Sequence, residues 1–219
     1  MARRAFARSA IAPPLLLLAI FLPAGSLVYW QGWLFFTVIL ICGAFSSLYF
    51  SRRDPRLFER RMKFKERRPA QKIIVPLLYG LNVATIVVAA TDHRLGWSVD
   101  LPLLAVAGDL VVVAGFYLYF LVFRENSFAG STIEISADQR VISTGPYAIV
   151  RHPLYVALIV TTLGMPLALG SYWAALLVVP TVALLVWRLH DEEAYLVGDL
   201  RGYSEYERKV RWRLLPGVF

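Results

Sequence analysis

Six long apolar segments follow one another along the chain, separated by polar stretches. They run over residues 11–29, 34–50, 73–91, 101–123, 153–169 and 172–189. Their lengths match the roughly 17–25 residues that an α-helix needs to cross a bilayer core. None has the alternation over about ten residues that is typical of a transmembrane β-barrel strand. The pattern predicts an all-α integral membrane bundle with five or six transmembrane helices.

Only Gly170 and Ser171 separate the last two apolar segments. So short a connection predicts a helical hairpin over residues 153–189, with both ends on the same side of the membrane. We interpret residues 1–219 as a single membrane domain. Within it, residues 1–123 contain four transmembrane helices, and residues 124–219 contain the hairpin and a charged tail.

Basic residues gather in alternate polar segments. Four segments are rich in Lys and Arg: the N-terminal arm, the loop 51–72, the segment 124–152 and the tail. The polar connections that alternate with them contain a single basic residue, Arg94. Cytoplasmic loops carry the excess of Lys and Arg, so both termini are expected in the cytoplasm. The net charge of +8 then reflects membrane topology rather than nucleic-acid binding.

Composition supports the membrane interpretation, because 58% of the residues are hydrophobic. The N-terminal segment resembles a signal peptide, but the second apolar segment follows almost at once, which favours a first transmembrane helix. The only cysteine, Cys42, excludes an intramolecular disulfide. Residues 54–67 predict either a short interfacial helix or a solvated loop attracted to anionic lipid.

The stretch GPYAIVRHPLY, residues 145–155, places polar groups directly before an apolar helix. Gly145 and Pro146 predict a turn, and Pro153 fits the first turn of the next helix. The proline also biases His152 away from helical geometry. Arg151 and His152 therefore either face a cavity at a helix N-terminus, where anions are favoured, or anchor the chain in the headgroup region.

A second polar stretch, WRLHDEEAYL, ends the hairpin. Arg188 and Glu192 are four residues apart and share a helix face, which indicates either a site or simply a helix leaving the membrane. Because both hairpin ends lie on one side, His152, Tyr155, Arg188 and Glu192 are expected to meet in one pocket. A water-soluble cofactor would reach that pocket from the cytoplasm and a lipophilic substrate from the bilayer.

Two further features have alternative interpretations. The tail, with Tyr203 and Tyr206, either covers the pocket as a lid or lies on lipid headgroups. Asp109 is an acid inside an apolar segment, and such residues are often functional. The alternative is a buried interhelical hydrogen bond, for which Asn82 is a possible partner.

The hairpin and its flanks resemble the isoprenylcysteine carboxyl methyltransferase family. The resemblance rests on TGPYAIVRHPLYVA, the apolar hairpin, Arg188 followed by the pair Glu192–Glu193, and GYSEYERKVRWRLLPG in the tail. It covers residues 124–219 and implies a methyltransferase that uses S-adenosylmethionine (SAM) and releases S-adenosylhomocysteine. No GxGxxG motif of a soluble dinucleotide fold is present. The chain length resembles bacterial relatives and implies a bacterial inner membrane.

The resemblance also implies roles for individual residues. Arg188 would orient the acceptor group and Glu192 would act with it at the catalytic centre, without a metal. A carboxylate acceptor needs no base, whereas for an amine or thiol Glu192, Glu193 and His190 would compete for that role. The cofactor contacts implied are Gln139, Arg140, Val141, Ile142, Tyr147, His152, Pro153, Leu154, Tyr155 and Glu192.

The resemblance implies the class of reaction more firmly than it implies the substrate. The acceptor is expected to be lipophilic, and carboxyl O-methylation is the first expectation. The alternatives are N-methylation of a phospholipid or amine, S-methylation of a thiol, and a non-enzymatic membrane scaffold or transporter subunit. Retained activity after Arg188→Ala would favour N- or S-methylation, and absent SAM binding would favour the scaffold. The sequence does not predict the oligomeric state.

Overall fold

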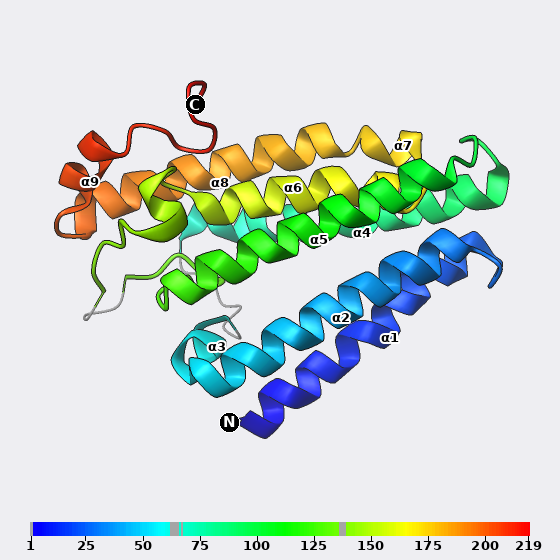
Figure 1. Cartoon of the computed structure of the whole chain (residues 1–219), viewed down its shortest axis with the longest axis horizontal. Coiled ribbons are helices and arrows are strands. Elements are labelled where there is room, and N and C mark those ends of the chain that lie inside the picture. Colours follow the sequence, from blue (N-terminus) through cyan, green and yellow to red (C-terminus); the bar gives the residue numbers. More distant parts are fainter. Residues whose placement is uncertain (1, 62–65, 67, 136–138) are drawn as a thin grey trace.

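The computed structural model describes residues 2–61, 66, 68–135 and 139–219, and the side chains of residues 2–10 are not described. The described part is all-α (Figure 1). Its helices are α1 (Ala2–Ala24), α2 (Trp30–Arg53), α3 (Pro55–Arg61), α4 (Pro69–Leu95), α5 (Pro102–Glu125), the 3-10 helix η1 (Gly145–Ala148), α6 (Pro153–Ala168), α7 (Tyr172–Ala175), α8 (Val178–Asp199) and α9 (Tyr203–Lys209).

Within the described part of the chain, four stretches are long and apolar enough to cross a membrane: α2, α4, α5 and the run Tyr172–Asp199, which joins α7 to α8. The apolar part of α1, Ile11–Ala24, and α6 are shorter. The predicted membrane bundle is therefore confirmed, and the chain is an integral membrane protein. The first and fifth of the six predicted segments are the short ones.

The long helices lie side by side in a single bundle (Figure 1). Helix α5 packs along α6, and α4 packs against α8, which places the predicted hairpin between them. Helices α1 and α2 form a second hairpin that contacts α4 and α5. This second hairpin leans away from α5 towards the end of the bundle where α3 lies.

Glycine allows α5 and α6 to approach closely. A Cβ on Gly108 of α5 would lie 2.2 Å from the backbone nitrogen of Ala168, and one on Gly164 of α6 would lie 2.8 Å from the Gly108 carbonyl oxygen. Small residues at helix contacts are the usual means of close packing inside a membrane. This tight pair fixes the position at which α6 begins and hence the position of the polar stretch before it.

Two predicted helix boundaries are wrong for identifiable reasons. The first segment was expected to continue to Tyr29, but α1 ends at Ala24 because Gly25 adopts a positive φ of 63°. The segment 172–189 was expected to form one helix, but α7 ends at Ala175 and α8 starts at Val178. Pro180 explains this break, since its ring clashes with the carbonyl of Leu176 in a continuous helix.

Helix α3 lies in the stretch 54–67, for which the sequence predicts either a short interfacial helix or a solvated loop. It covers Pro55–Arg61, and the Asp54 side chain accepts a hydrogen bond of 3.0 Å from the Leu57 nitrogen at its start. Residues 62–65 and 67 lie outside the described part of the chain. The helical alternative is therefore confirmed for the first half of that stretch.

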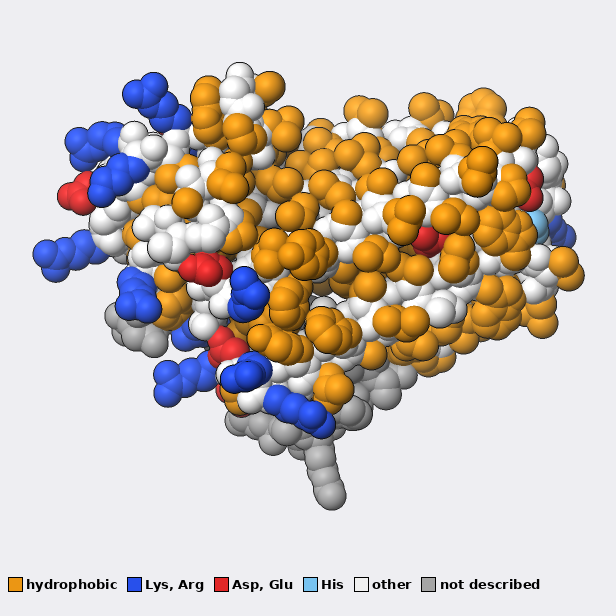
Figure 2. Space-filling view, viewed as in Figure 1, with side chains coloured by type: hydrophobic (Ala, Val, Ile, Leu, Met, Phe, Trp, Pro, Cys, Tyr) orange, Lys and Arg blue, Asp and Glu red, His pale blue; other side chains and the backbone are white. Residues whose placement is uncertain are grey.

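The two ends of the bundle differ in chemistry. Lys and Arg side chains gather at the end that carries α3, α9 and the tail (Figure 2). At the opposite end the Asp92 carboxylate accepts hydrogen bonds from the Ser98 nitrogen (2.7 Å), the Ser98 hydroxyl (2.6 Å) and the Ser171 hydroxyl. These bonds tie the α4–α5 connection to the turn before α7. The charge asymmetry expected from the sequence is therefore present in the structure.

Candidate functional site

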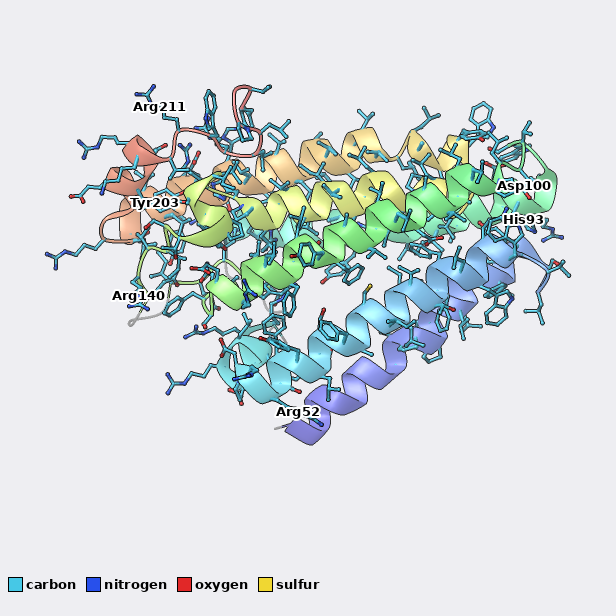
Figure 3. The ribbon with its side chains drawn as sticks, viewed as in Figure 1. Arg52, His93, Asp100, Arg140, Tyr203 and Arg211 are labelled. Atoms are coloured by element: carbon cyan, nitrogen blue, oxygen red, sulfur yellow. The ribbon has the colours of Figure 1, made fainter. Side chains whose placement is uncertain are left out.

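A cavity of about 350 Å³ lies at the basic end of the bundle. Its wall is made by α3, α4, α5, α6, α8 and α9, together with η1 and residues 126, 128–135, 139–142, 151–152 and 200. Arg140 and Tyr203, both in this wall, lie at the same end of the molecule, far from His93 and Asp100 (Figure 3). The cavity thus opens where the polar segments meet the ends of the apolar helices.

Almost all residues that the resemblance implies are in this wall. They are Gln139, Arg140, Val141, Ile142, Tyr147, His152, Leu154, Tyr155, Arg188 and Glu192. Pro153 does not line the cavity, because it is buried in the first turn of α6. Its place is structural, since its fixed φ fits the start of a helix and leaves His152 non-helical at φ −123° and ψ 60°.

Tyr155 and Glu192 join the two ends of the hairpin. The Tyr155 hydroxyl donates a hydrogen bond of 2.6 Å to Glu192 Oε2. The Arg188 guanidinium lies near the same phenol. The geometry therefore brings together Tyr155, Arg188 and Glu192, as the hairpin prediction requires.

Protein groups surround the Arg188 guanidinium. Nη1 donates to Gln71 Oε1 (2.8 Å) and to Glu66 Oε1 (3.3 Å), and Nη2 donates to the Ser131 carbonyl (2.9 Å) and to Glu66 Oε1 (3.4 Å). Glu66 and Gln71 are buried and do not line the cavity. They contact Arg188 from outside the cavity wall, and the Glu66 carboxylate forms an ion pair with it.

Gln71 extends this contact to a second ion pair. Its amide nitrogen donates to Asp191 Oδ2 at 2.6 Å, and Asp191 also accepts two hydrogen bonds from Arg68, at 2.6 and 2.9 Å. The start of α4 is thereby fixed to the second half of α8. The bidentate pair of Arg68 and Asp191 has a defined orientation. Gln71 is hydrogen-bonded to Asp191 and to Arg188, so it links Arg188 to this fixed pair.

Glu193, next to Glu192, has a structural position. It is buried, and it accepts hydrogen bonds from Arg151 Nε (2.8 Å) and from Arg213 Nε (2.6 Å), with His152 Nε2 at 3.4 Å. Arg151 also donates to the carbonyls of Val210 and Arg211, both at 3.1 Å. The pair Arg151–Glu193 therefore clamps the tail to the hairpin.

The tail covers one side of the cavity. Tyr203 and Tyr206 of α9 are buried in its wall, so they do not lie on a lipid surface. The Tyr206 hydroxyl donates to the Tyr147 carbonyl at 2.8 Å, and the Tyr147 hydroxyl accepts from the Asn126 amide at 2.9 Å. Burial raises the pKa of the Tyr147, Tyr203 and Tyr206 phenols, so all three are neutral hydrogen-bonding groups at physiological pH.

Asp109 and His190, which the sequence offered as candidates, do not line this cavity. Asp109 is buried in α5, outside the wall, and neither carboxylate oxygen has a hydrogen-bond partner among the described residues. Asn82 lines the cavity but donates to Leu78 in its own helix at 2.8 Å, so the suggested Asp109–Asn82 hydrogen bond is wrong. His190 is exposed beside Phe219, also outside the wall.

Other wall residues were missed because they lie outside the motifs. Arg61 of α3, Tyr79 of α4 and Tyr119 of α5 all line the cavity. The only sequence signal for Arg61 was its place in a basic loop, which is equally consistent with a contact to lipid. Glu66 and Gln71 gave no signal, because their contact with Arg188 depends on how α4 packs against α8.

Part of the chain that forms this cavity is similar to known methyltransferases. Residues 103–199 match a family described as phospholipid methyltransferase. The protein-S-isoprenylcysteine O-methyltransferase of Schizosaccharomyces pombe is 38% identical over 81 residues. The match covers 33% of this chain and 32% of the relative, so the chain spans about a third of the length of that relative. The resemblance to the isoprenylcysteine carboxyl methyltransferase family is therefore confirmed over the part of the chain that these matches cover.

The region matched by the family includes α5, α6, α7 and α8. It therefore contains the hairpin, with Tyr155, Arg188 and Glu192, and the segment 139–142. Arg61, Glu66, Gln71 and the tail lie outside it.

Proposed function

We propose that this protein is a SAM-dependent methyltransferase that acts on a lipophilic acceptor at the membrane, of the isoprenylcysteine carboxyl O-methyltransferase type. The observation that carries this proposal is the cavity in which Tyr155, Arg188 and Glu192 meet residues 139–142. The name of the Schizosaccharomyces pombe relative supports the reaction type.

The groups around the cavity suit the cofactor. Tyr147, Tyr203 and Tyr206 offer aromatic surfaces for an adenine ring. Glu192 Oε2 accepts the Tyr155 hydrogen, which leaves Oε1 to accept from the ribose hydroxyls or the amino group. SAM, when bound, supplies an electrophilic methyl group carried on a sulfonium sulfur.

The protein's own contribution is to position the two reactants and to exclude water. A carboxylate acceptor carries a free lone pair, so no proton has to be removed and the cavity needs no base. Arg188, fixed by Gln71 and Glu66, defines one wall against which the acceptor is oriented. The tail, clamped by Arg151 and Glu193, covers the side with Tyr203.

The proposed orientation follows from charge. The cavity lies at the end where Lys and Arg gather (Figure 2), and positive loops face the cytoplasm. We therefore place the cavity and both termini in the cytoplasm, with SAM entering from there. By the resemblance to bacterial relatives, the membrane is a bacterial inner membrane.

N-methylation of a phospholipid or amine is the second candidate. It is favoured by the position of Glu66, because a guanidinium already paired with a carboxylate is not available to a second one without displacing it. Removing a proton from an amine needs a base. Of the three candidates, Glu192 lines the cavity, whereas His190 is exposed elsewhere and Glu193 is held in ion pairs.

Calorimetric titration of SAM and S-adenosylhomocysteine into the purified protein tests the proposal. Wild type is expected to bind both, and Glu192→Ala to bind at least about tenfold more weakly, the effect of removing a charge-assisted hydrogen bond. Glu59→Ala, an exposed carboxylate on α3, is the matched control and should bind as wild type does. Folded wild type that binds neither compound, in detergent and in nanodiscs, would favour a non-enzymatic scaffold.

A further inference from the structure

Arg61 is a second guanidinium in the cavity wall, and its environment differs from that of Arg188. Its Nη1 donates one hydrogen bond of 3.2 Å to the Gly130 carbonyl, and its guanidinium lies 4.7 Å from the centre of the Phe123 ring. Within residues 2–61, 66, 68–135 and 139–219, no carboxylate forms an ion pair with it. Arg61 therefore brings a charge to the cavity that these residues do not neutralise.

Arg188 has little capacity left by comparison. A guanidinium has four terminal N–H groups and one on Nε. The four terminal contacts of Arg188 go to Gln71, Ser131 and, twice, Glu66. An anion that enters the cavity thus meets two arginines. The terminal N–H groups of Arg188 already have partners, whereas only one N–H group of Arg61 forms a hydrogen bond with the described residues.

The surroundings of Arg61 favour an anion. Burial lowers the pKa of Arg61 and the nearby Arg188 charge lowers it further, whereas Tyr119 and Tyr79 raise it. Arginine nevertheless stays charged, so Arg61 is a partly desolvated cation for which the described residues supply no counter-ion. Oxygen anions compensate such a charge well, because the planar fork of arginine matches carboxylate and phosphate geometry.

The same part of the cavity reaches the outer surface of the bundle. Tyr79 lines the cavity, yet it is 59% exposed on α4. Tyr79 and the lining residues Val75 and Leu78 belong to one of the membrane-crossing helices. A lipophilic molecule approaching along α4 would therefore bring its polar end to Arg61.

We propose that Arg61 binds the anionic oxygen group of the lipophilic acceptor, with the Tyr79 and Tyr119 hydroxyls beside it. The inference rests on the proposed function and specifies the acceptor further, as an amphiphile with a carboxylate or a phosphodiester at its polar end. The two sources share the chemistry that Arg61 recognises. Arg61 is thus a binding residue for the acceptor, distinct from the residues around Glu192 assigned to the cofactor.

Binding of charged and uncharged ligand pairs to the full-length protein tests this inference. The first pair is an S-prenylcysteine and its methyl ester, and the second is short-chain phosphatidylethanolamine and diacylglycerol. Wild type should bind the charged member of one pair about tenfold or more tightly than its neutral counterpart. The pair that shows this preference identifies the source of the anion.

Arg61→Gln should lose the preference and keep wild-type affinity for S-adenosylhomocysteine. Arg56→Gln, which removes an exposed charge from the same helix, should behave as wild type. Arg61→Met, whose chain keeps the packing on Phe123, replaces Arg61→Gln in the same comparison if the glutamine variant does not fold.

An unchanged preference in the folded Arg61 variant, or no preference for either charged ligand in wild type, would overturn the inference. The titrations are run with and without S-adenosylhomocysteine. Absent cofactor binding by folded wild type therefore counts against the proposed function, while the charge preference still decides the role of Arg61.

Discussion

The Tyr155 hydroxyl donates a 2.6 Å hydrogen bond to Glu192 Oε2 and so joins the first turn of α6 to the second half of α8. The two residues are 37 positions apart in the sequence, and the hairpin brings them side by side at the cavity. Because Glu192 is the proposed contact to the cofactor, Tyr155 fixes the carboxylate on which that contact depends.

Tyr155→Phe removes this bond and keeps the ring. We expect affinity for S-adenosylhomocysteine to fall about tenfold or more, since a hydrogen bond to a charged group contributes about 1.5 kcal/mol or more. The thermal midpoint should change little, because the ring still packs with Leu185 and Leu189. Calorimetry measures the affinity, and an unchanged value would show that Tyr155 does not orient Glu192.

The clamp between Arg151 and Glu193 should contribute to stability. Removing Arg151 leaves the buried Glu193 with Arg213 as its partner, and removing Glu193 leaves the buried Arg151 with Glu207 at 3.4 Å. Each change should therefore cost less than the roughly 3–5 kcal/mol of a fully uncompensated buried charge. Arg151→Ala and Glu193→Ala should each lower the thermal midpoint, and the double variant should lose less than the sum of the two. Arg208→Ala, an exposed change in α9, serves as control. Additive losses would mean that the two residues do not act as a pair.

The contact of α5 with α6 should not tolerate a methyl group. Gly108→Ala would place its Cβ against the backbone of Ala168, and overpacking of this kind costs roughly 1–3 kcal/mol. Gly43→Ala in α2 is the matched control, because no atom outside its own helix lies within 4 Å of the added Cβ. Thermal unfolding in detergent should show a lower midpoint for Gly108→Ala alone, and equal midpoints for both variants would contradict the packing.

The tyrosines around the tail predict a loss of stability in alkali. Burial raises the pKa of Tyr147, Tyr203 and Tyr206 in the folded protein, whereas an unfolded tyrosine titrates near pH 10. Their contribution to stability is therefore full below about pH 10 and falls as the pH rises towards the folded pKa values. Between pH 8 and pH 11 the thermal midpoint of Tyr203→Phe should fall less steeply than that of wild type.

The exposed Tyr117 provides the control for this titration. Tyr117→Phe removes a phenol with 61% exposure and should leave the wild-type slope unchanged. Parallel curves for Tyr203→Phe and wild type would contradict the assignment of Tyr203 as a buried, neutral phenol.

Much of the cavity was predictable because it depends on local patterns and on one hairpin. The apolar segments indicated which helices cross the membrane, and the short turn at Gly170 brought the polar ends together. The spacing from Arg188 to Glu192 placed both on one helix face. The break before Pro180 was missed in the sequence, although proline disrupts the helix that precedes it.

The partners of the arginines were not predictable in the same way. That Glu66 and Gln71 hold Arg188, and that Glu193 pairs with Arg151 while its neighbour Glu192 faces the cavity, depends on packing between segments distant in sequence. Arg61 lay in a basic loop for which lipid attraction was a sufficient explanation. No local pattern distinguishes an arginine that contacts lipid from one that enters a cavity.

Methyl transfer from labelled SAM to an organic-extractable product is the most direct test of the proposed function. Membranes containing wild type should incorporate label into lipophilic material, and those containing Glu192→Ala should not. Alkali should release the label as volatile methanol, because a methyl ester hydrolyses whereas an N-methyl group does not. Alkali-stable label would instead support N- or S-methylation. No transfer by wild type that is folded and supplied with S-prenylcysteine and amino-headgroup lipid would contradict a membrane methyltransferase.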